Sequence, residues 1–176
     1  MRSLLSLAAL ILTFALAPTT HADEKKPTLS PGDTPPDMML GYTRRNEEIS
    51  VDKAPGTVRV VTFWASWCGP CRQEIVMLNK LAEVAPDKLK VVAVNIDEWQ
   101  TFKEVTKQFF ESKVIYANDR SRQARAAYGV NGIPHMVIIG KDGKVVAVKR
   151  GYSEESLPGL LREIEVEIRK GESQHQ

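Results

Sequence analysis

The chain has 176 residues, of which 43% are hydrophobic, so it is long enough and apolar enough to bury the core of one ordinary domain. Its 24 basic residues exceed its 22 acidic residues by only 2, and neither sign forms a block. This composition argues against a wholly disordered chain, and it offers no basic surface of the kind that binds nucleic acid.

The first 22 residues are predicted to be a secretory signal peptide. Arg2 supplies a positive start, a mostly apolar run follows over residues 3–17, and Ala22 stands at a small-residue cleavage position. We expect cleavage near Ala22 and a periplasmic or otherwise extracytoplasmic location. The alternative is an uncleaved membrane anchor, although about fifteen apolar positions are at or below the length that spans a bilayer.

Behind the signal peptide, the chain divides into a linker, a domain and a tail. Residues 23–37 are polar and rich in proline, which disfavours a helix, and they are interpreted as an extended linker. Residues 38–170 are expected to form the domain and residues 171–176 a C-terminal tail. Within the domain, residues 38–52 are predicted to hold a short hairpin with "EISV" as one strand.

The next part of the domain is a strand, a turn and a helix in direct succession. Residues 58–64, "VRVVTFW", form a β-branched and aromatic run that is typical of a strand covered on both faces. Gly69 and Pro70 then break the strand period. Apolar residues at helical spacing follow and predict a helix that ends near Pro86.

Strands and helices alternate along the rest of the domain, which indicates a parallel sheet. The expected elements are a strand at 88–96, a helix at 98–112, a strand at 114–119, a short helix at 121–130 capped by Ser121, two strands within 136–151 joined at Asp142-Gly143, and a C-terminal helix beginning near Ser156 with Ser153 or Ser156 as its cap.

The only two cysteines, Cys68 and Cys71, stand where the strand gives way to the helix. A disulfide across two intervening residues constrains the unfolded chain very little, so stability is a poor reason for the pair. Cys68 is expected to be exposed at the helix N-cap, and Cys71 to be shielded one turn inside. The helix terminus lowers the pKa of Cys68 from the free value of about 8.5. Its thiolate could attack a substrate disulfide, and Cys71 could resolve the product without any cofactor.

Neighbouring residues suit this reaction. Gly69 lets the backbone turn tightly, and Pro70 has the fixed φ favoured in the first turn of a helix. Trp67 is predicted to offer a flat apolar surface to a partner, whereas core packing is the better interpretation of Trp64.

The stretch "FWASWCGPCR" at 63–72 closely resembles the active-site motif of the thioredoxin superfamily. The signal segment, the predicted hairpin and the long segment 95–128 are similar to the exported TlpA/ResA-type branch, and the resemblance covers roughly residues 30–168. It implies an α/β, thioredoxin-like fold with a central mixed sheet flanked by helices, an N-terminal hairpin extension and a central βα insertion. It also implies a thiol-disulfide oxidoreductase.

A second match is "GIPH" at 132–135. In the family a cis-proline lies opposite the dithiol, and here it would be Pro134. A cis bond there would present the backbone of Ile133 to an extended substrate peptide, which could pair with it as an added strand.

The sequence departs from the family pattern at three positions. Thr62 stands where thioredoxin has a buried aspartate that helps to move the proton of the inner cysteine. Glu74 matches an acidic residue of the TlpA/ResA branch and is the candidate substitute, with an ordinary solvated helix residue as the alternative. Val76 replaces the proline that usually kinks the helix, which could leave the helix straighter. His135 replaces a common threonine and could lie close to Cys68.

His135 opens a second hypothesis from a different class of protein. Two thiolates with a nearby imidazole would suit Cu(I), or Zn(II) with a further ligand. A copper-binding or copper-delivery protein that uses Cys68, Cys71 and His135 is therefore the alternative. The redox interpretation needs no metal, and it leaves His135 as a pH-sensitive or merely polar rim residue.

The two residues between the cysteines indicate the direction of electron flow. The Gly-Pro pair between the cysteines is typical of the reducing thioredoxins, whose reduction potential is about −270 mV, rather than of the strong oxidants, whose reduction potential is about −120 mV. We therefore expect a reductase of disulfide-bearing proteins. The resemblance implies a membrane electron donor of the DsbD/CcdA kind, and substrates such as apocytochrome c thiols in cytochrome c maturation or the cysteine pairs of copper-delivery proteins.

Overall fold

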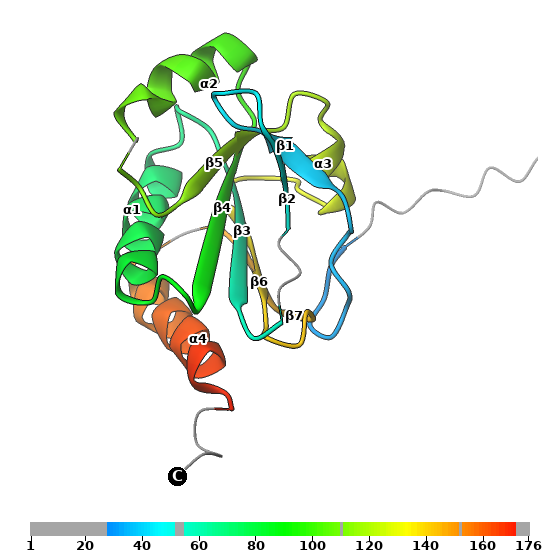
Figure 1. Cartoon of the computed structure of the whole chain (residues 1–176), viewed down its shortest axis with the longest axis vertical. Helices are drawn as coiled ribbons and strands as arrows, with labels where there is room; N and C mark the ends of the chain where they lie inside the picture. Colours follow the sequence, from blue (N-terminus) through cyan, green and yellow to red (C-terminus); the bar gives the residue numbers. More distant parts are fainter. Residues whose placement is uncertain (1–27, 52–54, 110, 152, 172–176) are drawn as a thin grey trace, which may run out of the picture.

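The computed structural model describes residues 28–51, 55–109, 111–151 and 153–171. In these ranges one seven-stranded sheet has the order β2-β1-β5-β4-β3-β6-β7 (Figure 1). The strands are β1 (Met39–Tyr42), β2 (Glu48–Ser50), β3 (Val58–Trp64), β4 (Leu89–Asn95), β5 (Ile115–Asn118), β6 (His135–Ile139) and β7 (Val145–Arg150). The helices are α1 (Gly69–Val84), α2 (Trp99–Val105), α3 (Gln123–Ala127) and α4 (Leu157–Arg169), with 3-10 turns η1 (Thr106–Gln108) and η2 (Glu154–Ser156).

The sheet is mixed, as the family resemblance implies. β3, β4 and β5 run parallel, whereas β6 and β7 are antiparallel to their neighbours. β1 and β2 form the predicted N-terminal hairpin, and Tyr42 of β1 pairs with Asn118 of β5. Gly41 is required at this contact, because a Cβ there would lie 2.4 Å from the Asn118 carbonyl oxygen.

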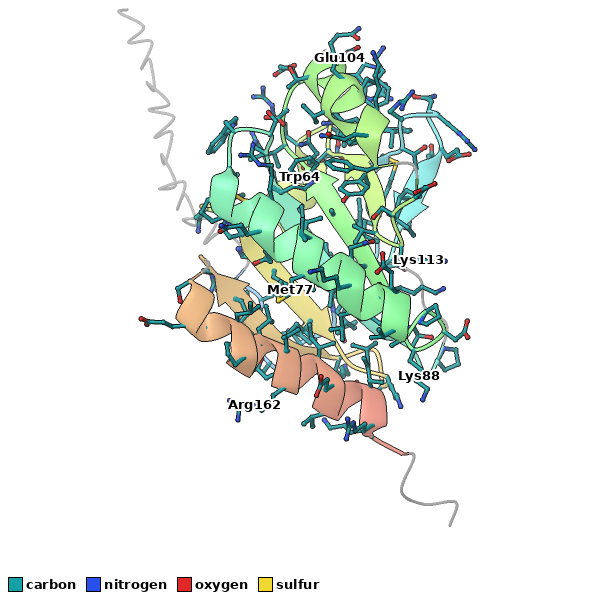
Figure 2. The ribbon with its side chains drawn as sticks, turned by 90° about the vertical axis from the view of Figure 1, so that its left-hand side faces the viewer. Trp64, Met77, Lys88, Glu104, Lys113 and Arg162 are labelled. Carbon is teal, nitrogen blue, oxygen red and sulfur yellow. A yellow bond between two sulfur atoms is a disulfide. The ribbon has the colours of Figure 1, made fainter. Side chains whose placement is uncertain are left out.

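Two hydrophobic clusters lie on the two faces of this sheet. All seven residues of β3 are buried, so β3 is the central strand that the sequence predicted. Its alternate side chains divide between the faces, since Val60 and Trp64 pack with α1 and α4 while Val61 and Phe63 pack with α3. Figure 2 shows α1 and α4 lying side by side over one face of the sheet.

Two helices differ from their predictions. The helix expected over 98–112 ends at Val105, because the hydroxyl of Thr106 donates to the Phe102 carbonyl at 2.6 Å and the chain tightens into η1. The helix expected at 121–130 is the shorter α3, and its predicted cap is wrong. Arg122, with φ of 61°, occupies the N-cap position in place of Ser121.

The carboxylate of Asp119 explains the wrong cap. It accepts the amides of Ala124 at 3.2 Å and Arg125 at 2.9 Å, so a charged acceptor takes the place of the serine hydroxyl. α4 begins directly after Ser156, as predicted, but the Ser156 hydroxyl donates to the Ser153 carbonyl rather than capping the helix.

The described part of the predicted linker, residues 28–37, lies against the domain. Leu29 is buried in the α3-side cluster, and the amide of Gly32 donates to the Val145 carbonyl at 2.8 Å. The predicted signal peptide and the first residues of the linker fall outside the described residues, as does all but Gly171 of the tail, and the domain boundaries stay predictions. No helix in the described part of the chain has the length and apolar character to cross a bilayer.

Candidate active site

Cys68 and Cys71 form a disulfide at the entrance of α1. Their sulfurs are 2.03 Å apart and their Cα atoms 5.3 Å apart. Cys68 is the N-cap, as predicted, and its sulfur accepts the amide of Cys71 at 3.3 Å. The predicted exposure of Cys68 is wrong for this oxidised form. It is only 6% exposed, because the bond turns its sulfur toward Cys71 and into the cluster beneath α1, whereas Cys71 is fully buried.

The two tryptophans beside the pair have the different environments that the sequence predicted. Trp64 is buried, and its ring packs edge-on against Phe109 and Tyr116 with centroids 6.5 and 5.9 Å away. Trp67 is 72% exposed next to Cys68. Trp64 therefore belongs to the core, and Trp67 is free to contact a partner.

A buried polar network holds the loop that carries Trp67. The carboxylate of Asp97 accepts the backbone amide of Ser66 at 2.7 Å and the side-chain amide of Asn95 at 2.9 Å. The Asn118 side chain in turn donates to Asn95 Oδ1 at 3.0 Å. These residues were not predicted from the sequence. Their signal was a pair of polar residues, Asn95 and Asn118, ending two adjacent apolar strands.

Glu74 is buried one turn of α1 beyond Cys71. It is 2% exposed, and its Oε1 accepts the hydroxyl of Thr62 at 2.6 Å. Burial raises the pKa of Glu74 to about 7, and the hydrogen bond from Thr62 opposes that rise. The alternative of a solvated helix residue is therefore wrong. Thr62 thus donates a hydrogen bond to Glu74, the residue predicted to take over the role of the missing aspartate.

A cavity of about 390 Å³ opens beside this carboxyl group, and we call it the Glu74 cavity. Besides Glu74, it is lined by residues from β7, from the turn after β7 and from α4, including Arg150, Ser153 and Leu160. Lys149 also lines it and pairs with Glu163 at 2.7 Å. Polar side chains of β7 and of the turn after it therefore line the same cavity as the buried carboxyl group.

Ile133 and Pro134 lie at the same end of the sheet as the disulfide. The bond between them is cis, as the family resemblance implies. His135 pairs with Phe63 in the β3–β6 register, so Pro134 lies beside the end of β3, from which the chain runs directly to Cys68. The Pro134 carbonyl accepts the Gly151 amide at 2.8 Å. Among the described residues, no backbone hydrogen bond engages Ile133, so its main chain is available to a peptide.

His135 lies on the other face of the sheet from Cys71. The prediction of a rim residue is wrong, because the His135 ring is buried and packs edge-on against Phe63, with centroids 6.1 Å apart, in the region where α3 packs. The structure therefore does not bring its imidazole together with the two sulfurs. In the described ranges no group of three or more His, Cys, Asp or Glu side chains is placed to hold a metal ion. Val76 is exposed within an uninterrupted α1.

The fold and the paired cysteines define a thioredoxin-like protein, and comparison with known proteins identifies its family. Residues 30–164 match the redoxin family, so the chain belongs to that family. The thiol-disulfide oxidoreductase ResA of Geobacillus thermodenitrificans is 30% identical over 145 residues, which cover 81% of this chain and 83% of the relative. A thioredoxin of Rhodospirillum rubrum is 39% identical over 104 residues, or 59% of this chain and 77% of the relative.

Solved structures agree with this assignment. The crystal structure of a DsbE-like thiol:disulfide interchange protein from Chlorobium tepidum matches with a TM-score of 0.68 and 29% identity, and the match covers 80% of this chain and 99% of that one. The protein is thus a thiol-disulfide oxidoreductase of the TlpA/ResA type.

Proposed function

We propose that this protein is an extracytoplasmic reductase of protein disulfides, with Cys68 and Cys71 as its redox pair. The observation that carries the proposal is the placement of Cys68 at the N-cap of α1, where its sulfur accepts the Cys71 amide at 3.3 Å. Unpaired amides and the positive end of the helix dipole stabilise a thiolate at this position in the reduced protein. Cys68 is therefore the attacking sulfur.

The reaction transfers two electrons from the dithiol to a substrate disulfide. The Cys68 thiolate attacks one substrate sulfur, which forms a mixed disulfide and releases the other substrate sulfur as a thiolate. Cys71 then loses its proton and attacks the Cys68 sulfur. This step restores the Cys68–Cys71 disulfide seen here and releases the second substrate sulfur. Both electrons come from the two cysteines, so the step needs no cofactor.

Glu74 is the proposed acceptor for the Cys71 proton. It lies on the same helix three residues later, and its pKa of about 7 lets the carboxyl group take up and release a proton near neutral pH. Thr62 positions the carboxyl group through its 2.6 Å hydrogen bond. The Glu74 cavity gives the proton an exit to solvent.

Substrate binding is assigned to the surface around the disulfide. Trp67 offers an exposed apolar face, and the open backbone of Ile133 can pair with an extended peptide, next to the bend at Pro134. Gly69 and Pro70 form the first turn of α1 between the cysteines, where they shape the approach to the redox pair.

An exported reductase needs a source of electrons, because its compartment is oxidising. The predicted signal peptide over residues 1–22 and the similarity to ResA support export and a membrane-bound dithiol donor of the DsbD/CcdA kind. Proteins of cytochrome c maturation and copper-delivery proteins are the proposed substrates, since both present cysteine pairs that must be reduced before they can bind their group.

A redox titration tests the direction of electron flow. Mature protein without residues 1–22 is equilibrated with dithiothreitol buffers, and its reduction potential is expected near the thioredoxin value of about −270 mV. A potential near about −120 mV would show an oxidant and overturn the proposal. In parallel, the protein should accelerate insulin reduction by dithiothreitol. If it does not, the protein has no disulfide-exchange activity.

A further inference from the structure

A separate cavity is lined by Trp67 and by residues at and after α3, and it carries positive charge. It has a volume of about 590 Å³, within the range of about 300–1,000 Å³ typical of ligand sites. Apolar walls come from Trp67, Ile96, Val130 and Ile133. Among the described residues, the charged side chains that line this cavity are those of Arg122 and Arg125, and no carboxylate lines it. We call it the arginine groove.

The fold holds both arginines at this groove. Arg122 begins α3 in a left-handed conformation, and the Asp119 carboxylate fixes the following turn by accepting the Ala124 and Arg125 amides. The Asp119 charge is thus directed at backbone N–H groups. The Asp97 carboxylate, in the loop after β4, accepts hydrogen bonds from Ser66 and Asn95.

Neither guanidinium has a strong partner within the protein. Arg122 pairs with Glu98 at 3.5 Å, but both side chains are mostly exposed, so this ion pair is weak and a substrate carboxylate can replace Glu98. The side chain of Arg125 is half-buried and makes no hydrogen bond or ion pair with any described residue. A half-buried guanidinium is a ready binding partner for a carboxylate, which it can hold through two parallel hydrogen bonds.

We propose that the arginine groove binds an acidic side chain of the substrate polypeptide, next to the disulfide that Cys68 attacks. The enzyme would then prefer disulfides flanked by aspartate or glutamate. The occupant is a segment of the substrate, because Trp67 and Ile133 belong both to the groove and to the surface assigned to the substrate backbone. This inference rests on the proposed function and adds a substrate preference to it.

Three disulfide-linked fluorescent peptides test the preference. They share one sequence and differ only in a Glu, Gln or Lys beside the cysteine, and kcat/KM for their reduction is measured with dithiothreitol as the electron source. Wild type should favour the Glu peptide over the Gln peptide about fivefold, and added salt should reduce that ratio. Equal rates on the Glu and Gln peptides would overturn the inference while leaving reductase activity intact. Failure to reduce any of the three would overturn the proposed function as well.

Variants then assign the preference to the groove. Arg125→Gln should bring the Glu-to-Gln ratio near one, and the double charge reversal Arg122→Glu with Arg125→Glu should favour the Lys peptide. Because each ratio is taken within one enzyme, a loss of folded protein cancels. Arg162→Gln is the matched control, since Arg162 lies on the outer side of α4 (Figure 2). If Arg162→Gln lowers the ratio as much as Arg125→Gln, the arginine groove is not the site.

Discussion

The Glu74 cavity is lined by a residue one helical turn after Cys71 and the arginine groove by the residue before Cys68, yet the walls of the two are chemically different. The Glu74 cavity, of about 390 Å³, reaches a buried carboxyl group with a raised pKa and lies on the side of α4. The arginine groove, of about 590 Å³, has an exposed tryptophan and two guanidinium groups and lies on the side of α3. In the proposed mechanism, proton transfer belongs to the Glu74 cavity and substrate recognition to the arginine groove, so substitutions on the two sides should change different measurements.

The largest expected effect is at Cys68, the proposed attacking sulfur. Cys68→Ser should lower disulfide exchange at least about 10³-fold, because the nucleophile is lost. Cys71→Ser should instead accumulate a mixed disulfide between Cys68 and the substrate, visible by mass spectrometry. The rate of disulfide exchange is measured with the insulin-reduction assay. Substrate captured on Cys71 in the Cys68→Ser variant would contradict the order of attack.

Glu74→Gln should act on the Glu74 cavity alone. Resolution of the mixed disulfide is expected to slow about 10²-fold at pH 7, since a positioned proton acceptor contributes about 10²–10⁴-fold. The step in the pH–rate profile near pH 7 should disappear, while the ratio between Glu and Gln peptides should stay unchanged. Stopped-flow kinetics measure the rate at which the mixed disulfide is resolved. Glu83→Gln, at an exposed position of the same helix, is the control. A wild-type pH profile in Glu74→Gln would exclude the carboxyl group from the reaction.

The same carboxyl group should make stability depend on pH. Its pKa is raised from 4.5 unfolded to about 7 folded, so its contribution is fully present below pH 4.5 and is lost as the pH rises through 7. The shift corresponds to about 3 kcal/mol. Urea unfolding of the oxidised protein at pH 4 and pH 8 measures it. The difference in free energy of unfolding between wild type and Glu74→Gln should change by about that amount from pH 4 to pH 8. If the two proteins instead depend on pH in the same way, Glu74 is not desolvated.

Local sequence was enough to predict the centre of the site. β3, the turn at Gly69-Pro70 and α1 follow one another within about thirty residues, and strand period, helix period and N-cap position are all set by near neighbours. The cysteine pair was therefore placed correctly. Pro134 was found through the family motif, and the β3–β6 register then placed it beside the end of β3.

The burial of Glu74 could not be predicted in the same way. In helix α1 alone, this residue could equally face solvent, whereas in the fold its carboxylate meets Thr62 of β3 and a cavity lined by β7 and α4, more than seventy residues later. Long-range pairing also decided the position of His135. Its register with Phe63 directs the ring to the α3 face, away from Cys71, whereas the sequence showed only that it follows Pro134.

The smallest expected effect concerns the wall of the arginine groove. Trp67→Ala should lower kcat/KM for protein substrates about fivefold, because a large apolar contact surface is lost. The free energy of unfolding should change by less than about 0.5 kcal/mol, since the side chain is 72% exposed. Reduction of a small disulfide such as oxidised glutathione should hardly change, because so small a substrate does not need the groove. Val84→Ala, at an exposed apolar residue at the end of α1, is the control for nonspecific effects. If Trp67→Ala slows the small and the protein disulfides equally, Trp67 acts on the redox pair itself, and the separation between recognition and chemistry does not hold on this side of the site.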